Sequence, residues 1–164
     1  MTAKGKIMKK LSTIFAVVTL LLTFTFQPAF AADNVISMEV EYLEDGGRYV
    51  TIIEDVPTSD IQPLSTKTET KSKTAYYENA AGKVMWYVKV TGTFTYGDGT
   101  SKCISATPSA ASQNSDWKVS NVTGGKSGNK AYATATGKKY LDGTVIDTKT
   151  KTVTLTCSPT GVFS

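Results

Sequence analysis

Residues 84–96 read VMWYVKVTGTFTY and alternate between two sets of side chains. One face of a strand here would carry Val84, Trp86, Val88, Val90, Gly92, Phe94 and Tyr96. The other face would carry Met85, Tyr87, Lys89, Thr91, Thr93 and Thr95. An α-helix has a period of 3.6 residues and would not produce this alternation, so the pattern predicts a long, half-buried β-strand.

The rest of the chain shows the same kind of pattern, with no stretch of convincing helical period after the first 31 residues. Further strands are expected at residues 35–43, 48–54, 102–106, 116–122, 130–141 and 144–157. Asp142-Gly143 is a strong two-residue hairpin signal. Small side chains at Ala131, Ala133, Ala135 and Gly137 share one strand face, so a bulky aromatic of the 84–96 strand is expected against them. The chain is therefore predicted to be all-β, an antiparallel two-sheet sandwich with an N-terminal β-hairpin.

Residues 1–31 have the layout of an export signal that is helical in the precursor. Lysines at positions 4, 6, 9 and 10 precede an apolar stretch at 11–26, and Pro28 leads to small residues at Ala29 and Ala31. We expect cleavage after Ala31, with Ala32 as the near alternative. A membrane anchor is disfavoured because the uninterrupted apolar core, residues 14–26, is shorter than the about 20 residues of a spanning helix. The leader holds the whole excess of positive charge, so the mature chain has no net charge.

Charge divides the mature chain. Residues 33–63 carry eight acids and the single base Arg48, whereas residues 64–164 carry 13 lysines and six acids. The expected organisation is a signal peptide at 1–31, an acidic β-hairpin at 32–56, a linker at 57–64, a Lys/Thr-rich β-sandwich domain at 65–158 and a C-terminal tail at 159–164. Opposite charge predicts that the hairpin docks against the Lys-rich part, in the same chain or in a neighbouring one. The alternative is that the hairpin is a mobile acidic arm for an external cationic partner.

Cys103 and Cys157 are the only cysteines. An even count in an exported chain predicts a structural disulfide bond between them. Trp117 lies between the two, which invites comparison with the immunoglobulin fold. The match is partial, because Leu155 stands where that fold has a tyrosine, and only seven residues follow Cys157. The sequence therefore leaves the immunoglobulin topology open as one form of the sandwich.

The absence of histidine from the whole chain removes several chemistries. Ser-His-Asp and Cys-His catalysis and histidine-based zinc sites are excluded, and no cofactor or metal is expected. Residues 124–129, GGKSGN, precede a strand rather than a helix, so they predict a flexible loop and not a phosphate site. Carboxylate chemistry remains open, since Glu39 and Glu41 share a strand face, although an exposed hairpin face is the simpler interpretation. Glu44-Asp45-Gly46 is a weak calcium signal because it lacks the spacing of a calcium loop.

Aromatic side chains are the remaining candidates for binding. Tyr76, Tyr77 and Tyr87 are predicted to form a ligand surface, although cross-strand packing is the commoner use of such residues. Trp86 is expected in the core. Nucleic-acid binding is disfavoured by a single arginine and a neutral mature chain.

Three segments carry a family resemblance: MEVEYLEDGGRYVTIIED, WYVKVTGTFTYGDGTSKCISA and KKYLDGTVIDTKTKTVTLTCS, at residues 38–55, 86–106 and 138–158. They resemble a group of small, exported, uncharacterised proteins of Gram-positive bacteria. The resemblance implies export but no particular activity, and it carries over no functional residues.

The C-terminal residues lack a wall-sorting signal, so we expect a secreted protein without covalent anchoring or a membrane span. The expected function is non-enzymatic binding or interaction at the cell surface, with a glycan or protein partner. The alternative is a carboxylate-dependent hydrolase acting on envelope glycans.

Overall fold

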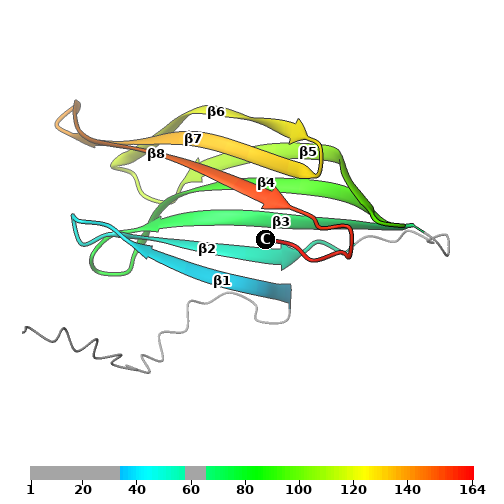
Figure 1. The fold of residues 1–164 in the computed structure, drawn as a ribbon. Helices are drawn as coiled ribbons and strands as arrows, with labels where there is room; N and C mark the ends of the chain where they lie inside the picture. The colour runs from blue at the N-terminus through cyan, green and yellow to red at the C-terminus, as the bar shows by residue number, and fades with distance from the viewer. Residues whose placement is uncertain (1–33, 58–65) are drawn as a thin grey trace, which may run out of the picture. The chain divides into compact units, whose positions relative to one another are not determined.

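A computed structural model describes residues 34–57 and 66–164, and these form an almost entirely β structure (Figure 1). The strands are β1 (Val35–Tyr42), β2 (Arg48–Asp55), β3 (Lys67–Glu78), β4 (Val84–Gly97), β5 (Thr100–Ser112), β6 (Trp117–Ser127), β7 (Lys130–Leu141) and β8 (Thr144–Thr156). The expected leader, the two expected cleavage positions Ala31 and Ala32, and most of the expected linker lie outside the described residues. No helix among the described residues is long and apolar enough to cross a membrane.

The strands form two antiparallel sheets, which confirms the predicted two-sheet sandwich. One sheet has the order β1-β2-β3-β4-β5 and the other the order β6-β7-β8, so within each sheet the strands that pair are neighbours in the chain. The immunoglobulin topology requires non-sequential neighbours within each sheet. The structure instead has two successive meanders, joined where β5 leads into β6.

The acidic hairpin is an integral part of the larger sheet. Strand β2 pairs with β3 along its whole length, from Arg48 opposite Glu78 to Asp55 opposite Lys71. Across this ladder the Arg48 guanidinium lies 2.6 Å from the Glu78 carboxylate, whose side chain is only 5% exposed. Tyr49 and Ile53 of β2 are buried in the core between the sheets. The expected docking of the hairpin is therefore intramolecular, through backbone pairing and apolar burial.

The core is filled where β4 faces β7. Trp86, Val88, Val90 and Phe94 of β4 are fully buried, as the alternation predicts. The small residues of β7 make room for them: a Cβ on Gly137 would lie 2.6 Å from Trp86 atoms. Burying a large apolar side chain stabilises a fold by about 1.5–3 kcal/mol, so this aromatic-on-small contact is a principal source of stability.

Two local expectations are corrected. Gly124 and Gly125 lie within β6 rather than in a flexible loop, and Gly124 is closely packed, since a Cβ there would lie 2.4 Å from the Tyr132 carbonyl oxygen. The turn comes later, at Gly128, which has a φ of +57°. Strand β3 was not predicted as a strand at all. By contrast, the predicted Asp142-Gly143 hairpin turn is found, with φ values of 48° and 79°.

Candidate functional site

The tyrosines predicted to form one ligand surface lie on opposite faces of the larger sheet. Tyr76 and Tyr87 are cross-strand neighbours on its outer face, with ring centroids 5.8 Å apart. Tyr77 points into the sandwich and is 5% exposed. Its ring packs 5.2 Å from that of Trp117. Because neighbouring strand residues alternate between faces, adjacency in sequence separates Tyr76 from Tyr77 in space.

Cys103 and Cys157 are free, buried thiols, so the expected disulfide is not formed in this structure. Both residues border the β6–β7 turn, where their backbone N–H groups donate to the carbonyl oxygens of Gly128 and Asn129. The Cys103 thiol donates to the Ser105 carbonyl oxygen at 3.1 Å, and the Cys157 thiol to that of Ser158 at 3.4 Å. Each sulfur is thus engaged with its own chain segment rather than with the other sulfur. Burial raises the pKa of both thiols, which disfavours thiolate chemistry.

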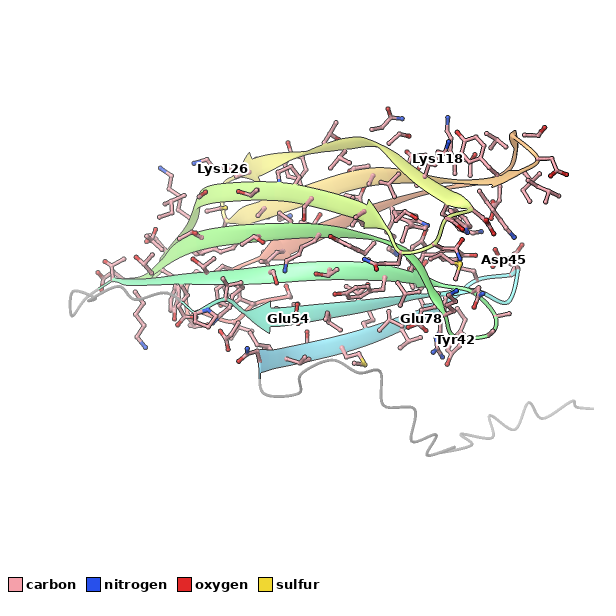
Figure 2. The ribbon with its side chains drawn as sticks, turned by 180° about the vertical axis from the view of Figure 1, so that it is seen from behind. Tyr42, Asp45, Glu54, Glu78, Lys118 and Lys126 are labelled. Atoms are coloured by element: carbon pink, nitrogen blue, oxygen red, sulfur yellow. The ribbon has the colours of Figure 1, made fainter. Side chains whose placement is uncertain are left out.

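A pocket of about 410 Å³ lies at the end of the sandwich where the β1–β2 and β3–β4 turns are found. Its buried apolar side chains are Tyr77, Met85 and Trp117. Its polar side chains are Asp45, Asn79, Lys139 and Asp147. We call this the end pocket. Figure 2 shows Asp45 and Lys118 at this end of the sandwich, and Lys126 toward the other.

Register explains how the smaller sheet contributes to the end pocket. Trp117 pairs with Lys139, and Lys139 pairs with Asp147, so one row across β6, β7 and β8 brings an indole, an ammonium and a carboxylate together. The larger sheet contributes Tyr77, near the end of β3, and the adjoining hairpin turn contributes Asp45. The β1–β2 turn, the end of β3 and the β6–β7–β8 sheet thus bring together groups that lie far apart in sequence.

The carboxylates of the end pocket are tied to one lysine. Lys149 Nζ lies 2.5 Å from Asp45 Oδ2 and 3.4 Å from Asp147 Oδ2. The Lys149 hydrogen bond, helped by the Gly47 N–H, lowers the pKa of Asp45 below its ordinary value. The Tyr77 hydroxyl also donates to Asp45 Oδ2, at 3.3 Å. Asp45 is therefore held as an anion, already satisfied by donors.

The same kind of contact continues along the hairpin. Glu41 of β1 forms an ion pair with Lys151 of β8, whose ammonium lies 4.4 Å from the Tyr49 ring centroid. Burial lowers the pKa of Lys73 of β3, and the negative charge of Glu39, two residues before Glu41 on the same face of β1, has a smaller opposing effect. We call this row the seam: Asp45, Glu41 and Glu39 on the hairpin, with Lys149, Lys151 and Lys73 opposite them. It is the contact that the opposite charges of the two parts predict.

Sequence reasoning missed Lys139, Asp147 and Lys149. A usable signal was present, because Asp147, Lys149 and Lys151 alternate with threonines and therefore share one strand face. Among the described residues, no three Asp, Glu, Cys or His side chains are grouped so as to hold a metal ion, and the Glu44-Asp45-Gly46 calcium interpretation gains no support. Comparison of the chain with protein-family models, curated proteins and solved structures finds no match.

Proposed function

We propose that this is a secreted, non-enzymatic binding protein of the bacterial cell surface, and that its end pocket binds a neutral, polyhydroxylated ligand of the glycan class. The proposal rests on the balance of charge around the apolar side chains that line the end pocket. Asp45 and Asp147 are matched by Lys149 and Lys139, so the pocket favours neither an anion nor a cation. Hydroxyl groups can both donate to carboxylates and accept from lysine or asparagine.

The apolar side chains support the same ligand class. Tyr77, Met85 and Trp117 offer buried apolar surface at the base of the end pocket, while charged and amide groups surround it. A few polar groups that fix orientation above an apolar base are typical of small-ligand sites, and the volume falls in their usual range of about 300–1,000 Å³. The apolar C–H faces of a sugar ring and its hydroxyl edge match such an arrangement.

Glycan hydrolysis is the second candidate, because two carboxylates face one pocket. It is disfavoured by the electrostatics of Asp45. A general acid in such an enzyme needs a raised pKa, whereas hydrogen bonds from Lys149 and Gly47 lower that of Asp45. Both carboxylates are also joined through a lysine rather than left free to flank a scissile bond. These features suit holding a ligand better than cleaving one.

The test is a glycan and cell-wall array probed with the mature protein, followed by calorimetry on any ligand found. Lys139→Ala and Asp147→Asn should each weaken binding by about tenfold, the equivalent of losing one good charged hydrogen bond. Lys130→Ala is the matched control, because Lys130 begins β7 at the end away from Lys139 and is exposed. Absence of glycan binding by the wild type, or variants that bind as the wild type does, would contradict the proposal. Release of new reducing ends would favour the hydrolase.

A further inference from the structure

The seam has a second cavity at its other end, and it differs from the end pocket in chemistry. About 320 Å³ of space lies beside the inner face of β1 and β2. Ile53 and Phe163 provide its apolar side chains, and Glu39 and Lys73 provide its charged groups. We call it the tail pocket, because Phe163 belongs to the segment after β8 that turns back toward β2 and β3 (Figure 1).

The apolar wall of the tail pocket is firmly held. Ser164 and Thr156 exchange two backbone hydrogen bonds, of 3.0 and 2.8 Å, which fix the returning segment against β8. The Phe163 ring packs edge-on against Phe94 of β4, with centroids 5.4 Å apart. The Lys71 ammonium also lies 5.3 Å from the centroid of this ring. Phe163 is therefore packed against the core rather than part of a loose tail.

The charges of the tail pocket are arranged differently from those of the rest of the seam. Asp45 with Lys149 and Glu41 with Lys151 are closed ion pairs. Among the ion pairs of residues 34–57 and 66–164, none joins Glu39 to Lys73. Glu39 lies on β1 and Lys73 on β3, with β2 between them and an offset of two residues along the strands, so their backbones are about 12 Å apart. The third carboxylate and ammonium of the seam thus stand open across a cavity.

The open pair selects one class of ligand by charge. An anion alone would meet the Glu39 carboxylate, and a cation alone would meet Lys73 with Lys151 nearby. A neutral apolar molecule would desolvate both charges without replacing their hydrogen bonds, which is costly. Burial already lowers the pKa of Lys73, against the opposing effect of Glu39, so this ammonium gains from a closer anion. A zwitterion satisfies both groups at once.

We propose that the tail pocket binds an amino-acid-sized zwitterion with an apolar side chain. Its carboxylate lies on Lys73, its ammonium on Glu39, and its side chain against Ile53 and Phe163. The volume lies at the small end of the range for ligand sites, which suits an amino acid or a dipeptide. This site is separate from the end pocket and does not depend on glycan binding.

The test is a titration of the ¹⁵N-labelled mature protein with L-leucine, L-methionine and L-phenylalanine, followed by NMR. At least one of the three should shift the amide signals of Thr51, Lys73 and Phe163 while leaving those of Asn79 and Trp117 in place. N-acetyl-L-phenylalanine lacks the ammonium and L-phenylalaninamide lacks the carboxylate, so each should bind about tenfold more weakly than phenylalanine. Shifts confined to the end pocket, or no shift with any of the three at saturating concentration, would overturn the proposal.

Variants then assign the two charged groups. Lys73→Met should weaken phenylalanine binding and abolish the discrimination against phenylalaninamide. Glu39→Gln should abolish the discrimination against the N-acetyl compound. A general loss of structure would not produce this crossed pattern. Lys89→Met is the control, because Lys89 lies on the outer face of β4, opposite Thr74. Equal losses in all three variants, or unchanged selectivity in the first two, would refute the assignment.

Discussion

At the scale of single residues, the contact between Gly137 and Trp86 shows how closely this sandwich is packed. The indole lies directly on the β7 backbone, in the space that any side chain at position 137 would occupy. Gly92 makes the corresponding contact from β4, where an added Cβ would lie 2.9 Å from that of Ala131. The two sheets therefore come close together at positions that have no side chain. Larger residues are not accommodated at these two glycines.

Gly137→Ala is expected to destabilise the protein by about 1–3 kcal/mol, because the added methyl group forces Trp86 or the β7 backbone to move. Chemical denaturation of a protein that comprises residues 32–164 measures this effect. Gly125→Ala is the matched control in β6, since its Cβ would meet only the end of the half-exposed Tyr132 side chain, at 3.2 Å. Equal stability of the two variants would mean that the indole does not lie where the structure places it.

What the sequence predicts at this scale depends on whether a residue's role is local. Alternation alone placed Trp86 in the core and a small-residue face opposite it, because both are properties of a single strand. The two cysteines show the limit. Their number and the expected compartment predict a bond, but whether two thiols point at each other depends on the β6–β7 turn between them. The same holds for Tyr77, whose partners come from other strands.

At the scale of elements, β3 was overlooked because its first eight residues, 67–74, include no apolar side chain. Its sequence KTETKSKTAYYE has few apolar residues, yet it is an inner strand of the larger sheet. Lys71 is buried, and its ammonium is paired with Asp55 and Glu69. A period of two does exist, with charged residues alternating with threonine or serine from 67 to 74. A hydropathy profile does not reveal this alternation, because both sets of residues are polar. The alternation is visible only when charged residues are distinguished from threonine and serine.

Thr74→Pro distinguishes an inner strand from a linker. In an inner strand every backbone N–H donates to one neighbour or the other, so proline removes a ladder bond between β3 and β2 or β4. We expect loss of about 3 kcal/mol or more, and failure to fold if the protein is of ordinary stability. Thr66→Pro, just before β3 begins, should be tolerated. Circular dichroism and thermal melting of both variants provide the measurement, and a well-folded Thr74→Pro protein would contradict the position of β3.

At the scale of the whole described structure, the division of charge along the chain predicts the seam but not the pockets. Total charge is a property of segments, so an acidic hairpin facing a Lys-rich partner follows from the sequence alone. The end pocket joins Asp45, Lys139 and Asp147, which meet only after strand register has placed them. The tail pocket depends on the return of Phe163 to the core, for which the sequence offers no local pattern.

The hairpin is held in place by ion pairs, by backbone pairing and by apolar burial. The seam ion pairs are partly exposed, so each contributes under about 1 kcal/mol and is screened by salt over roughly 8–10 Å. Tyr49 and Ile53 are buried, and β2 has a full ladder with β3. Backbone pairing and apolar burial should therefore dominate, with the ion pairs setting how closely the hairpin approaches β8.

Amide hydrogen exchange on the mature protein at low and high salt separates these contributions. Residues 49–53 of β2 should exchange slowly in both conditions, whereas the β1 amides paired with β2 should exchange a few-fold faster in high salt, as expected for the loss of under about 1 kcal/mol. A Lys149→Met, Lys151→Met double variant should reproduce the high-salt result at low salt. Release of β2 together with β1 would show that charge holds the hairpin. Uniformly fast exchange across both strands, in either condition, would show that the hairpin is not part of the sheet.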